Sequence, residues 1–182
     1  MCYTEEKKEL DLLNAIQTIH TPALDTIMCG ITRLGNGGVF WLSLGLLLLL
    51  KPSKVRAGLI LFIAIGLEVL LCNGLLKHLF CRVRPCDVNT AIQLLIARPK
   101  DYSFPSGHTA VSFAAVAALY FSGEKLLWKL ALIPAVLIAF SRMYLYVHYP
   151  TDILGGALLG CLCGYMAYRL AKGLHMEKKQ VK

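Results

Sequence analysis

Long apolar runs dominate the chain and restrict what it can fold into. Residues 39–50, 55–76 and 126–140 contain few or no charges, and 57% of the 182 residues are hydrophobic. A helix needs roughly 20 apolar residues to cross the hydrocarbon core of a bilayer, and several runs meet or approach that length. This composition is too apolar for an ordinary soluble domain. The sequence therefore predicts an all-α, polytopic membrane helical bundle.

The chain is predicted to form one domain, residues 1–182, with three regions in order. Residues 1–34 carry apolar side chains at helical spacing, broken near Pro22, which indicates an amphipathic, interfacial region. Residues 35–171 are the transmembrane core, and residues 172–182 are a basic cytoplasmic tail. Five spans are expected, and a sixth in the N-terminal region is the alternative. The five are residues 39–50, 55–79, 106–121, 125–146 and 150–170.

Basic residues orient this predicted bundle. The formal net charge is +8, and the basic residues that produce it lie between or beyond the apolar runs. Membrane topology therefore explains these residues better than nucleic-acid binding does. The positive-inside rule predicts that the side with the most lysine and arginine residues is cytoplasmic. The basic residues on that side are Lys51, Lys54, Arg56, Lys125, Lys129, Arg169, Lys172, Lys178, Lys179 and Lys182. The loop after residue 79 and the junction near residue 148 then share the extracytoplasmic face. Basic residues kept on that face suggest an anion site.

Two further features bear on the core. The 7 cysteines lack paired CxxC spacings, so neither a zinc site nor a disulfide framework is predicted, and pairing of Cys81 with Cys86 stays open. Glu68 is an ionisable residue inside an apolar run, and such residues usually have a partner or a task. We expect a structural partner for it near Asn73.

Fixed cations and a helix start provide the means to bind a phosphoryl group. Lys77, Arg84 and Arg142 lie at the ends of hydrophobic segments, where arginine can clamp phosphoryl oxygens in pairs and lysine acts as a point charge. Ser106 and Gly107 begin a predicted helix, whose free N–H groups and positive dipole end favour an anion. Glycine also permits close backbone approach. The residues Arg82, Arg98, Lys100 and Tyr102 are predicted to shape the entrance.

Two histidines supply candidates for proton transfer and attack. His148 lies four residues before Asp152, so the carboxylate can hold one ring nitrogen and leave the other free as a nucleophile. His108, just inside a helix start, is the candidate acid that protonates the leaving oxygen. Phosphate hydrolysis needs both groups, in different protonation states.

The spacing of these blocks resembles that of the type-2 phosphatidic acid phosphatase superfamily. Its signature is Lys-x6-Arg-Pro, then Pro-Ser-Gly-His, then Ser-Arg-x5-His-x3-Asp, and all three blocks occur between Lys77 and Asp152. The resemblance implies that His148 forms a phosphohistidine, that Asp152 supports it and that His108 donates the proton. It also implies phosphate binding by Lys77, Arg84, Ser106, Gly107 and Arg142, with no metal and no cofactor.

The resemblance implies an integral-membrane lipid phosphatase in a bacterial cell membrane, and the charge distribution predicts that its active site lies on the extracytoplasmic face. Undecaprenyl diphosphate is the favoured substrate, with phosphatidic acid and phosphatidylglycerophosphate as alternatives. A phosphotransferase using the same site, or a small transporter or flippase for anionic substrates, also stays open. The expected partners are the lipid substrate and the bilayer, and the oligomeric state is undetermined.

Overall fold

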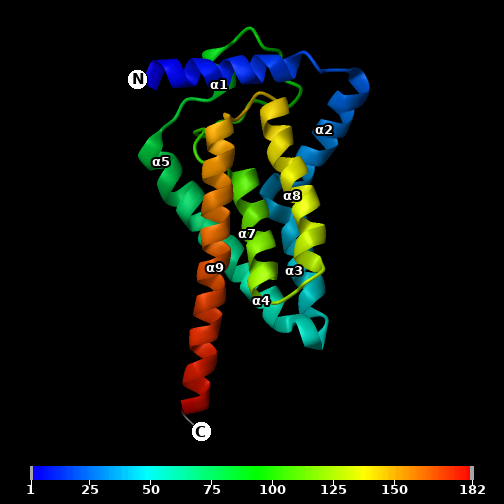
Figure 1. Cartoon of the computed structure of the whole chain (residues 1–182), viewed down its shortest axis with the longest axis vertical. Helices are drawn as coiled ribbons and strands as arrows, with labels where there is room; N and C mark the ends of the chain where they lie inside the picture. Colours follow the sequence, from blue (N-terminus) through cyan, green and yellow to red (C-terminus); the bar gives the residue numbers. More distant parts are fainter. Residues whose placement is uncertain (1, 181–182) are drawn as a thin grey trace.

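The structure is a computed structural model that describes the backbone of residues 2–180 and the side chains of residues 6–173 (Figure 1). All regular structure within the described backbone is helical, as predicted. The predicted basic tail lies mostly outside the described side chains. Its backbone through Gln180 continues the last helix, and residues 181 and 182 fall outside the described part.

The N-terminal region forms a cap and a bent helix pair. Helix α1 (Cys2–Gln17) lies across one end of the bundle, and α2 (Pro22–Leu34) descends from it (Figure 1). Thr21 caps α2 by accepting the Leu24 N–H at 3.3 Å. The short η1 (Asn36–Gly38) joins α2 to α3 (Val39–Leu49), and the pair bends by 49° at this break.

The second apolar run builds one long, irregular helical stretch. After η2 (Pro52–Lys54), it begins as α4 (Val55–Val69), loosens into the π-helix η3 (Leu70–Leu76) and ends as α5 (Lys77–Phe80). A π-helical segment shifts the register of the side chains that follow and is frequent at functional sites. Here it directly precedes Lys77.

Three helices complete the bundle around a central one. The short α6 (Pro85–Val88) starts a long loop that leads into α7 (Gly107–Phe121), and α8 (Leu127–Tyr144) and α9 (Pro150–Gln180) follow. Helix α7 packs against α4, α8 and α9. Its alanines, including Ala110, Ala114 and Ala118, are buried in the main apolar core.

Glycines on α9 let it approach α7 closely. A Cβ atom at Gly160 would lie 2.3 Å from the Ala110 carbonyl oxygen and 2.7 Å from the Ala114 nitrogen. At Gly156 it would lie 2.6 Å from the Ser106 carbonyl oxygen. Backbone atoms cannot move aside as a side chain can. Small residues therefore determine how closely these two helices pack, as at many helix contacts in membranes.

The span count differs from the sequence prediction. Within the described residues, 3 helical stretches are long and apolar enough to cross a membrane, and the bent pair α2 and α3 raises the count to 4. The 3 stretches are Pro52–Val88, Leu127–Tyr144 and Pro150–Gly173. Helix α7 is apolar but has only 15 residues, which is short for crossing the hydrocarbon core, so it is not among these stretches although residues 106–121 were predicted as a span.

Two other expectations can be compared with the structure. Cys81 and Cys86 are both free thiols rather than a disulfide. Glu68 is buried at 2% exposure, and its Oε1 atom has no hydrogen-bond partner among the described residues, so no hydrogen bond from Oε1 to Asn73 supports the expected pairing. Glu68 also lines the cavity described below.

Candidate active site

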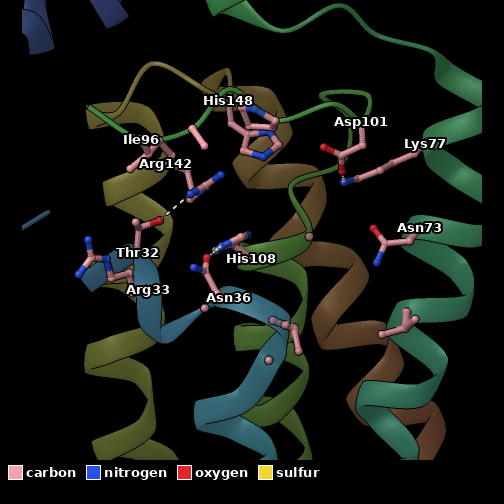
Figure 2. Close-up of a pocket in the computed structure, with 18 of the residues that line it drawn as sticks. Thr32, Arg33, Asn36, Asn73, Lys77, Ile96, Asp101, His108, Arg142 and His148 are labelled. Carbon is pink, nitrogen blue, oxygen red and sulfur yellow. Dashed lines mark hydrogen bonds and ion pairs between the residues drawn. The ribbon is translucent and has the colours of Figure 1, made fainter. Parts of the chain in front are cut away.

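The three sequence blocks meet around one cavity at the end of the bundle that α1 covers. The cavity has a volume of about 780 Å³. Each block reaches it from a different element, because a helix or turn ends there (Figure 2). The predicted residues that line it are Lys77, Arg84, Gly107, His108, Arg142 and His148.

His148 has one ring nitrogen turned to a carboxylate and the other to a cation. It lies in the turn between α8 and α9 and is 1% exposed. Its Nδ1 is 3.4 Å from Asp152 Oδ2, and its Nε2 is 3.1 Å from Arg84 Nη1. A guanidinium can only donate, so Nε2 must accept and carries no proton. The ring proton therefore lies on Nδ1, and the lone pair on Nε2 is available for attack.

The electrostatic surroundings keep this imidazole neutral. Burial lowers the pKa of His148 to about 3, the Asp152 carboxylate opposes that change, and the Arg84 and Arg142 cations add to it. An imidazole with this pKa is uncharged at neutral pH, which is the state that a nucleophile requires.

Asp152 is held in place from several directions. Its Oδ2 accepts a hydrogen bond from Ser103 Oγ at 2.5 Å and from the Tyr149 N–H at 2.9 Å. Its Oδ1 accepts one from Arg82 Nη1 at 2.7 Å. Asp152 is fully buried and lies behind His148 rather than in the cavity wall. This arrangement fixes the carboxylate and, through it, the imidazole.

Arg82 links this carboxylate to the N-terminal helix. Its Nη2 donates to Glu9 Oε2 of α1 at 2.5 Å, and its guanidinium lies 4.0 Å from the centre of the Tyr149 ring. Glu9 Oε1 also accepts from the N–H and the hydroxyl of Thr151. The sequence placed Arg82 at the entrance with Arg98, Lys100 and Tyr102. Of these four, only Arg98 lines the cavity.

The three predicted cations that line the cavity, Lys77, Arg84 and Arg142, are largely removed from solvent, whereas Arg33 and Arg98 line it from more exposed positions. Arg84 is 2% exposed, and its Nη1 also donates to the Val147 carbonyl oxygen at 2.7 Å. Arg142 is 4% exposed, donates from Nη1 to Thr32 Oγ1 at 2.6 Å, and leaves its buried Nε without a partner among the described residues. Lys77 forms an ion pair with Asp101. Buried cations with spare donors form a strong site for phosphoryl oxygens.

His108 faces His148 across the cavity, and Asn36 orients it (Figure 2). Its Nε2 is 2.9 Å from Asn36 Oδ1, an acceptor supplied by the glycine-rich η1 break between α2 and α3. An amide oxygen can only accept, so this contact places a proton on Nε2 of His108. That proton is directed at Asn36, and the ring can act as an acid toward a leaving oxygen when its second nitrogen is protonated as well.

We expect Asn36→Ala to lower kcat by about 10- to 100-fold and to change KM little, because the acid loses its orientation while the cations stay in place. Steady-state phosphate release in detergent measures both constants. Asn36→Asp keeps an oxygen acceptor and should recover part of kcat, and Asn89→Ala, outside the cavity, serves as the control. A rise in KM with kcat unchanged would contradict an orienting role.

The remaining predicted site residues differ in their position. Gly107 lines the cavity, and a Cβ atom there would come no closer than 3.6 Å to another residue, so packing alone does not require glycine. Ser106 is buried behind it, with its N–H donated to the Asp152 carbonyl oxygen and its hydroxyl accepting from Thr109. Ser106 is absent from the cavity wall, and in this structure it connects the start of α7 to the start of α9.

Sequence reasoning missed four residues that contact the predicted groups: Thr32, Asn36, Asp101 and Ser103. Thr32 is 110 residues from Arg142, and Asn36 is 72 residues from His108. No local spacing connects such pairs. The nearest available signal was the turn chemistry around Asn36 and the polar character of the loop that contains Asp101.

Fold and site together define a class. An apolar helical bundle whose polar end gathers a neutral histidine on a carboxylate, a second histidine and buried cations is a membrane protein built to act on a phosphoryl group. The sequence pattern of the PAP2 superfamily matches residues 57–175. The chain therefore belongs to the PAP2 superfamily, in its membrane lipid phosphatase branch, and is an integral membrane hydrolase.

Three relatives illustrate the similarity. Undecaprenyl-diphosphatase of Sulfolobus acidocaldarius is 29% identical over 88% of this chain and 77% of its own length. Lipid A 4'-phosphatase of Bacteroides thetaiotaomicron is 30% identical over 91% of this chain and 78% of its own. The crystal structure of the transmembrane PAP2-type phosphatidylglycerolphosphate phosphatase of Bacillus subtilis superposes with a TM-score of 0.74, at 28% identity, over 96% of this chain and 87% of that one.

Proposed function

We propose that this protein hydrolyses the phosphate of a lipid phosphomonoester or diphosphate through a phosphohistidine on His148, without a metal. Undecaprenyl diphosphate is the favoured substrate. The observation that carries the proposal is the unprotonated Nε2 of His148, which faces Arg84 at 3.1 Å in a cavity lined by cations. A transporter site has no need for a neutral imidazole backed by a fixed carboxylate.

In the first step, His148 Nε2 attacks phosphorus and the bond from phosphorus to the leaving oxygen breaks. His108, with both ring nitrogens protonated, gives one proton to that oxygen, which becomes the hydroxyl of the released group, and His108 is left as a neutral imidazole. Arg84, Arg142 and Lys77 bind the phosphoryl oxygens, whose negative charge must be neutralised as the transfer proceeds. Asp152 stabilises the positive charge that His148 acquires.

In the second step, a water molecule attacks the phosphohistidine. His108, now a neutral imidazole, takes a proton from the water, and the bond from phosphorus to His148 breaks to release inorganic phosphate. Both histidines thereby return to their starting states. Acceptance of the phosphoryl group by an alcohol instead of water would make the same site a phosphotransferase.

The arrangement of charges supports an extracytoplasmic active site. The loops with Lys51, Lys54, Arg56 and Lys125 lie at the end of the bundle opposite the cavity (Figure 1). The positive-inside rule places that end in the cytoplasm. With α7 counted as a short span beside the bent pair and the 3 long stretches, five spans result, and α1 lies on the side of the active site. This face is where a lipid carrier diphosphate would be presented after use.

Phosphate release from purified protein in detergent tests the proposal. Undecaprenyl diphosphate, phosphatidylglycerophosphate, phosphatidic acid and a lipid A phosphate should be compared at equal surface concentration. We expect turnover of at least one, with the highest kcat/KM for undecaprenyl diphosphate, and no loss when a chelator is added. Activity that a chelator removes and a divalent ion restores would contradict the metal-free route, and a higher kcat/KM for another lipid would overturn the substrate assignment.

A further inference from the structure

Asp101 occupies the space between two of the phosphate-binding cations. It lies in the loop before α7, and its Oδ1 accepts from Arg84 Nη2 at 2.7 Å while its Oδ2 pairs with Lys77 Nζ (Figure 2). Its side chain is 53% exposed, whereas those of Lys77 and Arg84 are 7% and 3% exposed. The cations are fixed parts of the site, and the carboxylate reaches them from the solvent side.

The contact imitates the binding of a phosphoryl group. A carboxylate presents two anionic oxygens to a guanidinium and an ammonium, as two phosphoryl oxygens would. Burial alone would raise the pKa of the Asp101 carboxyl, but Lys77 and Arg84 outweigh it and hold that pKa well below its usual range. Asp101 is therefore fully charged at neutral pH, and the same donors cannot bind it and a phosphate at full strength together.

The backbone nearby is bound independently of this carboxylate. Arg84 Nε donates to the Asp101 carbonyl oxygen at 2.8 Å, and Arg84 Nη2 lies 3.3 Å from the Tyr102 carbonyl oxygen. Rotation of the Asp101 side chain toward solvent breaks neither contact. The loop and Arg84 can thus stay in place while the carboxylate leaves.

We propose that Asp101 is an internal competitor for phosphate: it fills the anion position of the empty site and must leave before a substrate phosphate can bind to Lys77 and Arg84. This inference rests on the proposed function and deepens it. A site with three buried cations would otherwise hold inorganic phosphate tightly after each turnover. Return of the tethered carboxylate takes back the two donors and promotes release of the product.

Calorimetric titration of the purified protein in detergent with two non-hydrolysed anions tests the proposal. Inorganic phosphate at about pH 8 is mainly a dianion, and dimethyl phosphate is a monoanion. We expect Asp101→Asn and Asp101→Ala to bind both anions about tenfold more tightly, because either anion must displace the carboxylate in the unmodified protein. Product inhibition of lipid hydrolysis by inorganic phosphate should strengthen by the same factor.

Glu124→Gln is the matched control. It also removes a carboxylate that is paired with a cation, Lys54, but neither residue lines the cavity, and the pair lies at the opposite end of the bundle. Its affinity for both anions should stay unchanged. Weaker or unchanged binding in both Asp101 variants would show that Asp101 only braces the cations and would overturn the proposal. A clearly larger gain for the dianion than for the monoanion would also overturn it, because repulsion by a carboxylate that stays beside the bound anion grows with the charge of that anion, whereas displacement of the carboxylate adds the same factor for both.

The two proposals can fail separately. Anion affinities that change as expected, in a protein that releases phosphate from no lipid, would end the proposed function and leave Asp101 as a competitor at an anion site. Lipid hydrolysis by the unmodified protein, together with unchanged anion affinity in the Asp101 variants, would support the proposed function and contradict the proposed role of Asp101.

Discussion

His148→Ala is expected to reduce phosphate release by a factor on the order of 10⁴ or more. Among the described side chains, only His148 both contacts the Asp152 carboxylate and lines the cavity, so no other group can replace it. Initial rates on the best lipid substrate in detergent measure the loss. Brief exposure to substrate labelled in its phosphate should also label the unmodified protein through an acid-labile bond to histidine. That label should be missing from the variant.

His78→Ala is the matched control, since His78 lies in α5 beside Lys77 but does not line the cavity. It should keep both the rate and the label. Retained turnover in His148→Ala would contradict covalent catalysis at this residue. Label without turnover in His108→Ala, by contrast, would agree with an acid that is also needed to activate water in the second step.

Gly160→Ala is expected to prevent normal assembly of the bundle or to destabilise it by about 3 kcal/mol or more. The added methyl group would lie 2.3 Å from the Ala110 carbonyl oxygen and 2.7 Å from the Ala114 nitrogen, and neither backbone atom can yield without moving α7. Because α7 carries His108 at its first turn, activity should fall together with stability. Thermal unfolding in detergent, followed by tryptophan fluorescence, measures the change.

Gly173→Ala provides the comparison within the same helix. A Cβ atom at Gly173 would meet nothing within 4 Å, so this variant should match the unmodified protein or be slightly more stable. Equal unfolding temperatures for the two variants would mean that α7 and α9 are not packed as closely as the structure has them.

The ends of the helices could be predicted more reliably than their middles. Charged and proline-rich breaks mark where the long apolar stretches stop, and the motif blocks lie at those breaks, so their approximate meeting place followed from topology. The π-helical segment Leu70–Leu76 carries no such mark, because its sequence is as apolar as the helix before it. The bend between α2 and α3 does fall at a marked place, the glycine-rich break around Asn36, but the local pattern does not give its angle of 49°.

The partners of the site residues were harder to predict than the residues themselves. The spacing of His148 and Asp152 is local, since i and i+4 positions can meet across one turn, and the structure has them 3.4 Å apart. Thr32 and Asn36 come from the opposite part of the chain and contribute ordinary polar groups. Asp101 is one acidic residue in a loop with several charges, and nothing in the sequence distinguishes it from Asp87.

The contacts of Arg82 join α1 to the start of α9. Glu9 belongs to α1 and Asp152 to α9, which is synthesised long after it, yet both bind the same guanidinium. The carboxylate behind His148 therefore gains its full set of partners only after the start of α9 has been made and α1 has docked. A partly synthesised chain in the bilayer lacks a finished reaction centre, so hydrolytic competence arises as one of the final events of biogenesis.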